Sequence, residues 1–232
     1  MSLTRSTPES TRLAGKLNWL RAGVLGANDG IVSIAGLLMG FAGAQANSRA
    51  ILVAGLAGLV SGALSMAGGE YVSVSTQADT EKAALDAQAR QLSLHPDEEL
   101  RILAGSYQDR GLSPLLAQQV ADELTQHDAL SAHAETRLGI HPGELTNPWA
   151  AAASSFVAFA IGALIPLVLM VLSPVSLRVG ATVVGVELAL ALTGYTSARL
   201  GGAAPGRAII RNMLVATAAM AATYLIGALL AG

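Results

Sequence analysis

The distribution of hydrophobic residues along the chain predicts five long apolar helices. Each apolar run holds about 20 or more residues, which is enough to cross the hydrocarbon core of a bilayer. The predicted spans cover residues 22–45, 50–75, 149–172, 175–198 and 208–231. The first run is too long for a signal-peptide core and has no small-residue cleavage site after it, so we expect it to be retained as a span.

Between the second and third spans the pattern becomes polar and amphipathic. Residues 77–93 continue the second span as a polar helix, and a second helix begins at Pro96 and stops at Gly111. A third helix starts with Ser113 as N-cap and ends at Gly139. Its expected buried stripe consists of Leu116, Val120, Leu124, Leu130, Ala134 and Leu138. The predicted fold is an all-α polytopic membrane protein with five transmembrane helices and a three-helix acidic domain between the second and third spans.

Composition supports a membrane protein and narrows its chemistry. The chain has 232 residues, of which 52% are hydrophobic and 13% charged, against about 25% charged in an average soluble domain. It has no cysteine, which excludes disulfides and thiolate metal sites. Residues 76–148 hold twelve acidic and five basic residues, a formal charge of −7, together with all four histidines. Nothing in the charge indicates a nucleic-acid partner.

The basic residues predict the orientation in the membrane. Outside the acidic segment, seven of them flank one set of span ends and two, Arg49 and Arg178, flank the other. The positive-inside rule places the richer side in the cytoplasm. We therefore expect a cytoplasmic N-terminal segment (1–21), two spans (22–75), a cytoplasmic acidic domain (76–148), three more spans (149–232) and an external C-terminus.

Three carboxylates fall inside the predicted spans: Asp29, Glu70 and Glu187. Each costs about 2.5–3.5 kcal/mol or more at the bilayer centre, so an ionisable residue there indicates function. From the rise of an α-helix, Asp29 lies about 12 Å beyond Arg21, while Glu70 and Met66 lie about 9 Å and 15 Å from the cytoplasmic end of their span. We expect all three to share the inner layer of the membrane.

Met66 and Glu70 are four residues apart and share one face of their helix. A thioether beside carboxylates favours a first-row transition metal such as Fe²⁺, with Mn²⁺ also possible. The alternative is that Met66 fills a packing gap and Glu70 reaches the headgroups. For Glu187, pairing with Arg178 or a polar neighbour competes with a place on the ion path, and a structural role is at least as well supported.

Two other patterns have more than one interpretation. In the acidic segment, Glu123 and His127 have a workable metal-ligand spacing, although a solvated acidic face explains them equally well. Such a face would still collect cations at the entrance. Pairs of glycines four residues apart indicate close helix packing, either within the chain or between the first helices of two copies: Gly26 and Gly30, Gly36 and Gly40, Gly58 and Gly62.

The motifs "LRAGVLGANDGIVSIAGLLMGFAGA" and "LSMAGGEYVSVSTQADTEKA", with the "RGLSPLLAQQVADELTQHDALSAHAETRLGI" region, resemble the vacuolar iron transporter family in its bacterial branch. The resemblance runs from about Asn18 to the end. It implies a homodimer in the bacterial inner membrane that exports Fe²⁺, often also Mn²⁺, in exchange for protons. It also implies that Asp29 and Met66 are metal ligands on a path between subunits, with Glu70 as a third ligand or proton carrier.

The cytoplasmic segment departs from the family pattern. The family's metal-gathering glutamates fall near Gln88, Gln91, Glu99 and Ile102, and its methionines fall near His133 and Ala134. Only Glu99 keeps the acid, while His133 can replace a methionine as ligand. The candidate cytoplasmic ligands are therefore Glu99, Glu123, His127 and His133.

The leading interpretation is a proton-coupled exporter of Fe²⁺ or Mn²⁺ with no cofactor. Its partners are divalent transition-metal ions, protons, the lipid bilayer and a second copy of the chain. The alternative is a membrane-anchored metal-buffering or interaction protein that acts through the acidic domain. No nucleophile–base set or phosphate loop indicates an enzyme.

Overall fold

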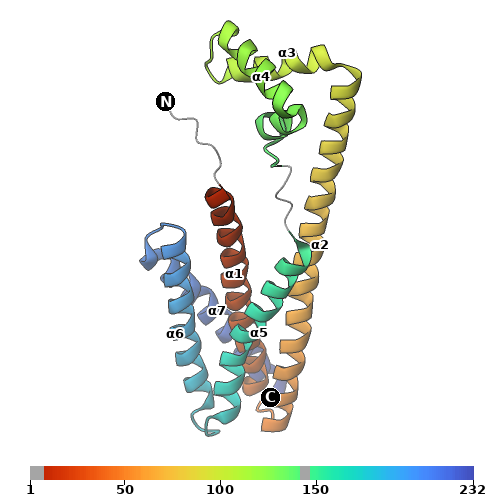
Figure 1. The fold of residues 1–232 in the computed structure, drawn as a ribbon. Coiled ribbons are helices and arrows are strands. Elements are labelled where there is room, and N and C mark those ends of the chain that lie inside the picture. The colour runs from red at the N-terminus through yellow and green to blue at the C-terminus, as the bar shows by residue number, and fades with distance from the viewer. Residues whose placement is uncertain (1–7, 142–146) are drawn as a thin grey trace. The chain divides into compact units, whose positions relative to one another are not determined.

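The computed structural model describes residues 8–141 and 147–232, with side chains described from Gly23 onward (Figure 1). Every regular element in these residues is helical, and five helices are long and apolar enough to cross a membrane. They are α1 (Pro8–Gly43), α2 (Ser48–Leu94), α5 (Pro148–Leu172), α6 (Arg178–Leu200) and α7 (Pro205–Ala231). The predicted all-α membrane fold is confirmed. The basic side chains expected in segment 1–21 lie outside the described side chains.

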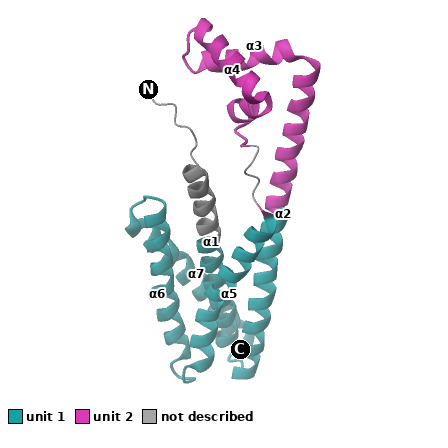
Figure 2. Cartoon of the chain, in the orientation of Figure 1, with its two compact units in different colours: residues 1–72, 148–232 teal, residues 73–147 magenta. Residues whose placement is uncertain are grey.

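The chain divides into two compact units (Figure 2). Unit 1 combines Met1–Val72 with Pro148–Gly232 and contains all five apolar segments, while unit 2 is Ser73–Asn147. Helix α2 contributes its apolar first part to unit 1 and its polar second part to unit 2. The second part is the polar continuation expected at residues 77–93.

Glycine lets α1 lie directly against two other helices in unit 1. At Gly30 an added methyl group would collide with the carbonyl oxygen of Phe159 in α5, and at Gly227 in α7 it would collide with the carbonyl oxygen of Gly40. Backbones approach this closely only where a residue has no side chain. Gly26 and Gly30 are therefore used in packing within the chain, which is one of the two interpretations that the sequence left open.

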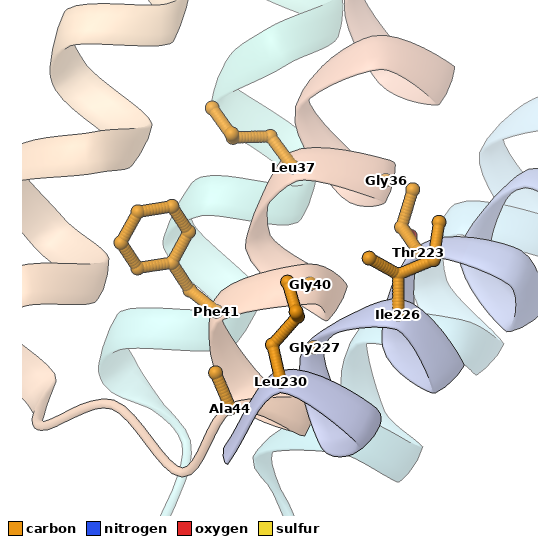
Figure 3. Close-up of a pocket in the computed structure, with 9 residues that line it drawn as sticks. All are labelled: Gly36, Leu37, Gly40, Phe41, Ala44, Thr223, Ile226, Gly227 and Leu230. Atoms are coloured by element: carbon orange, nitrogen blue, oxygen red, sulfur yellow. The ribbon is translucent and has the colours of Figure 1, made fainter.

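An open groove lies between α1 and α7 near this second crossing (Figure 3). Its lining is apolar except for Thr223, and it contains no charged side chain. The residues drawn are Gly36, Leu37, Gly40, Phe41, Ala44, Thr223, Ile226, Gly227 and Leu230. A lining of this kind suits lipid contact and offers nothing to a cation.

The membrane part of α2 is held more loosely than α1. At its glycines it meets side chains and, among the described residues, no backbone: Leu167 and Leu38 lie over Gly55, Ile34 over Gly58, and the ring of Phe159 over Gly62. Only 17% of the most apolar stretch of α2 is buried, against 44% of the corresponding stretch of α1. The outward face of α2 is exposed and apolar, at Val53, Leu56, Val60 and Leu64.

Unit 2 completes its fold with α3 (Pro96–Asp109), α4 (Pro114–His133) and the short π-helix η1 (Ala134–Leu138). Its small core consists of Leu103, Ala104, Ala121 and Ala132. Gly111 and Gly139 have φ values of +96° and +66°, a backbone conformation that favours glycine. The predicted stops at these two glycines are confirmed.

One detail of the predicted third helix was wrong. Leu116 and Leu138 are 49% and 40% exposed, whereas Ala117 and Ala121 are fully buried, and the small Ala121 packs with Leu103 and Ala104 of α3. The predicted N-cap Ser113 and the helix start at Pro114 are confirmed, and the Ser113 side chain makes no capping hydrogen bond.

The third helix is also interrupted at Asp128, which has non-helical torsions (φ −162°, ψ 93°). Its Oδ1 accepts a hydrogen bond from the backbone N–H of Ser131 (2.9 Å), and its Oδ2 accepts one from the Ser131 hydroxyl (2.7 Å). Asp128 thus acts as the N-cap of a new helical segment. These hydrogen bonds from Ser131 hold the pKa of Asp128 below its usual value.

Candidate metal and proton site in the membrane unit

Asp29 lies on a stripe of α1 that the rest of the chain leaves partly uncovered. Its side chain is half-buried, and its Oδ1 accepts a hydrogen bond of 2.9 Å from the hydroxyl of Ser33, one turn further along. Leu25, one turn before it, is 63% exposed. The carboxylate therefore keeps free lone pairs on an accessible surface of unit 1.

Contacts through α5 set the relative levels of α1 and α2. Phe159 packs its backbone against Gly30 and its ring against Gly62, and one turn further Ile34 lies over Gly58. In this antiparallel register, the rise of an α-helix places Met66 within about 5 Å of the level of Asp29, and Glu70 about 10 Å nearer the end of α1 that precedes Gly23. Asp29 and Met66 thus share a level, and Glu70 lies two turns away.

Met66 and Glu70 are both half-buried in the structure. Met66 packs against the hydrophobic core of unit 1, and the Glu70 carboxylate accepts no hydrogen bond from any described residue. In the described part of the chain, no three or more His, Asp or Glu side chains are close enough to hold a metal ion together. One copy therefore supplies an incomplete ligand set at this level: a carboxylate and a thioether.

Glu187 makes a different contact from the one expected with Arg178. Its Oε1 accepts a hydrogen bond of 2.6 Å from the Thr217 hydroxyl of α7, while its Oε2 is buried and has no partner. Arg178 instead donates to the carbonyl oxygen of Ala46 (3.3 Å) at the turn between α1 and α2. The second expected possibility, a polar neighbour, is the one that the structure shows.

Asn28 is a residue for which the sequence suggested no role. Its Oδ1 is buried without a hydrogen-bond partner. Among the described side chains of unit 1, only Asn28 and Glu187 have such unpartnered buried atoms. An asparagine inside an apolar span was visible in the sequence, but its orientation toward the core depends on the packing of α1.

In unit 2, Glu99 and His133 come together in a buried network. Glu99 Oε2 accepts hydrogen bonds from Gln88 Nε2 (2.7 Å) and Arg137 Nη1 (3.1 Å), and it lies 3.3 Å from His133 Nδ1. His133 is completely buried, and its Nε2 has no partner. Desolvation lowers the pKa of His133, against the opposing effect of the Glu99 carboxylate.

This network does not suit a resident metal ion. The Glu99 oxygen that faces His133 already receives two donors, one of them a guanidinium whose positive charge takes the place of a cation. The other two candidates, Glu123 and His127, are exposed on α4. The structure thus joins Glu99 with His133 and leaves Glu123 and His127 outside their network.

Comparison of the sequence with known proteins identifies a family. Residues 20–228 match the model of the VIT family. The chain is 43% identical over 190 residues to a "Vacuolar iron transporter" of Acanthamoeba castellanii, covering 82% of this chain and 70% of that protein. It is 39% identical over 212 residues to "Vacuolar iron transporter homolog 3" of Oryza sativa subsp. japonica, covering 91% of this chain and 70% of that protein.

A third relative extends the match. "Vacuolar iron transporter homolog 3" of Arabidopsis thaliana is 34% identical over 210 residues, covering 90% of this chain and 82% of that protein. These relatives are named as transporters and none as an enzyme, in agreement with the sequence analysis. With a family match across nearly all of its length, the chain belongs to the VIT family.

Proposed function

We propose that the protein transports Fe²⁺, and also Mn²⁺, out of the cytoplasm in exchange for protons. The observation that carries this proposal is the shared level of Asp29 and Met66 on two neighbouring spans. A carboxylate with free lone pairs and a thioether form a mixed ligand set that suits first-row transition metals. Membership of a family whose relatives are named vacuolar iron transporters supports iron as the substrate.

In the proposed cycle, metal enters past Glu70 and binds at Asp29 and Met66. Glu70 lies about two turns nearer the entrance, so it serves as a first ligand or as a proton acceptor. Metal and protons compete for the same carboxylate oxygens, and a proton that binds as the metal leaves couples the two fluxes. The membrane is the bacterial inner membrane, with the N-terminus and unit 2 in the cytoplasm and the C-terminus outside.

The working form is a homodimer. One copy offers too few ligands at the level of Asp29, and it leaves the stripe around Asp29 partly uncovered. The exposed apolar face of α2 offers a surface for a second copy. A dimer that brings two such stripes together would double the carboxylates and thioethers around the metal.

Unit 2 serves as a cation-attracting entrance in this proposal. Its segment carries a formal charge of −7, which raises the local concentration of divalent cations. The alternative function, a membrane-anchored metal buffer, requires tight binding in unit 2. The guanidinium of Arg137 on Glu99 argues against a tight site at that position.

The test uses purified protein in liposomes with an imposed pH gradient and either Fe²⁺ or Mn²⁺. We expect Asp29→Ala and Met66→Ala to abolish or strongly reduce metal flux while the protein still inserts and elutes as the native protein does. Asp109→Asn, an exposed carboxylate of unit 2, is the matched control and should transport normally. Undiminished flux in Asp29→Ala would refute the proposed path, and metal binding without flux in the unaltered protein would favour the buffer.

A further inference from the structure

Half-buried Glu187 and exposed Thr217 form a polar pair within the membrane-spanning parts of α6 and α7 that the proposed metal path does not use. Glu187 is nine positions after Arg178 and twelve before Arg199, so it lies near the middle of α6, about 14 Å from its first residue. The Thr217 hydroxyl is its one hydrogen-bond donor among the described residues, and Oε2 is buried without any. Burying a charged oxygen without a donor is unfavourable, whereas a proton on Oε2 removes the charge.

The pair belongs to other helices than the proposed metal ligands, since Glu187 lies on α6 and Thr217 on α7. Gly194 of α6 lies against Ile209 of α7, and Gly227 of α7 lies against Gly40 of α1. Counting along the helices from these two crossings places Glu187 level with about residue 32 of α1, roughly 5 Å from the level of Asp29 and on the side of the α1–α2 turn. The separation of Glu187 from the metal ligands is therefore one of helices and not of depth.

An open groove lies beside Thr217, between α1, α6 and α7. It has a volume of about 340 Å³ and includes Thr217, which donates to Glu187, and Val183, which precedes Glu187 by one turn of α6. From there it continues past Met39 and Met220 to Tyr224 and Val179, close to the first residue of α6. The lining of this groove is almost entirely apolar and Glu187 is not part of it, so the groove brings no competing ligand to the carboxylate.

No other charge lies against Glu187 among the described residues. Helix α5, which packs on α6, contains no charged residue, and the described side chains of α1 contribute only Asp29. The charged or titratable groups of α7 are Arg207 and Arg211 near its start and Tyr224 in the groove, while α6 itself adds Arg178, Tyr195 and Arg199. None of these bonds the carboxylate, so a proton is the one cation that the surroundings of Glu187 can accept without further ligands.

We propose that Glu187, held by Thr217, is the proton-binding site of the exchange, separate from the metal ligands Asp29 and Met66. A proton from water on one side of the membrane binds Oε2 and forms an O–H bond. That bond breaks when the proton passes to water on the other side, and Glu187 forms no bond to the metal at any step. The inference rests on the proposed exchange of metal for protons, and it adds that the two ions use different residues.

The experiment compares Glu187→Gln with the unaltered protein and with Asp109→Asn in liposomes, measuring Mn²⁺ uptake with and without a pH gradient. We expect Glu187→Gln still to bind Mn²⁺, as measured by titration calorimetry, but to lose the acceleration of uptake by the gradient. Thr217→Val should keep the acceleration and shift its pH profile, because the group that holds Oε1 is gone. Infrared difference spectra at two pH values should lose a carboxylic-acid band in Glu187→Gln.

The outcomes separate this inference from the proposed function. No Mn²⁺ uptake by the unaltered protein refutes the transport proposal itself, and uptake that ignores the gradient refutes the exchange and this inference with it. Gradient-driven uptake that persists in Glu187→Gln overturns only the inference. If Glu187→Gln does not fold, two other measurements decide. An unshifted pH profile of uptake in Thr217→Val, together with no protonation change in the carboxylic-acid region of the infrared spectra of the unaltered protein, overturns the inference.

Discussion

The crossing of α1 and α5 at Gly30 can be tested by adding a single methyl group. In Gly30→Ala the new Cβ would collide with the Phe159 carbonyl oxygen and lie 2.9 Å from the Ala163 nitrogen. Both obstacles are backbone atoms, so no side-chain rotation relieves the contact. The helices would have to separate by roughly an ångström to restore ordinary van der Waals distance.

Overpacking of this kind costs about 1–3 kcal/mol of unfolding free energy. For a chain of this size each kcal/mol lowers the unfolding midpoint by about 2–4 °C. The expected fall is therefore roughly 2–12 °C, reduced by the gain in helix propensity of up to about 1 kcal/mol when alanine replaces glycine. Because Asp29 is the preceding residue, the same shift should also slow metal transport.

Gly36→Ala is the matched control on the same helix. Its Cβ would meet the Thr223 Cγ2 at 3.7 Å, an ordinary contact, and it gains the same helix propensity. The difference between the two variants therefore isolates the collision. Thermal unfolding in detergent, followed by the loss of the monodisperse elution peak, measures it. Equal midpoints for Gly30→Ala and Gly36→Ala would refute the close backbone packing of α1 on α5.

Three further predictions concern unit 2, each measured in the full chain by hydrogen exchange of its helices. Burial lowers the pKa of His133, so on acidification the unfolded state binds a proton before the folded state does, and the stability of unit 2 should fall as the pH drops below about 6.5. His133→Gln should flatten this pH dependence, and an unchanged pH profile in that variant would contradict the prediction. Arg137→Met should destabilise unit 2 by about 1–3 kcal/mol, because it removes one of the hydrogen-bond donors to Glu99. Faster hydrogen exchange in α3 measures the effect, and an unchanged exchange rate would argue against the ion pair of Arg137 with Glu99. Asp128→Ala should cost about 1 kcal/mol and loosen residues 129–138 more than 114–127, whereas equal protection of both segments would show that the cap is unimportant.

Much of the fold could be predicted because its signals are local. Five apolar runs reveal the spans, and Gly111 and Gly139 mark helix ends through a backbone conformation that favours glycine. The break at Asp128 was missed because a capping aspartate followed three residues later by serine was hidden in a continuous helical pattern. The buried face of α4 was missed because leucines stood out in the sequence, whereas the buried residues include Ala117 and Ala121, and Ala121 packs on α3.

The pairing of polar groups could not be predicted in the same way. The hydrogen bond between Thr217 and Glu187 joins residues 30 positions apart, and the ion pair of Arg137 with Glu99 spans 38 positions. Each depends on the register between two helices, which no short motif specifies. The common level of Asp29 and Met66 was accessible, because it follows from the constant rise of two straight helices that meet at a short turn.

The contacts of α1 and α2 also give these two helices different freedom to move. Helix α1 touches α5 and α7 through backbone atoms, so it cannot slide without driving one main chain into another. At its glycines, helix α2 meets the side chains of Leu38, Leu167 and Phe159 and no backbone atom of another helix in the described part of the chain. A carrier needs one ligand that stays in place and one that moves. In the proposed metal path, Asp29 would then stay in place while Met66 moves with α2, and the barrier to that motion would lie in repacking these side chains.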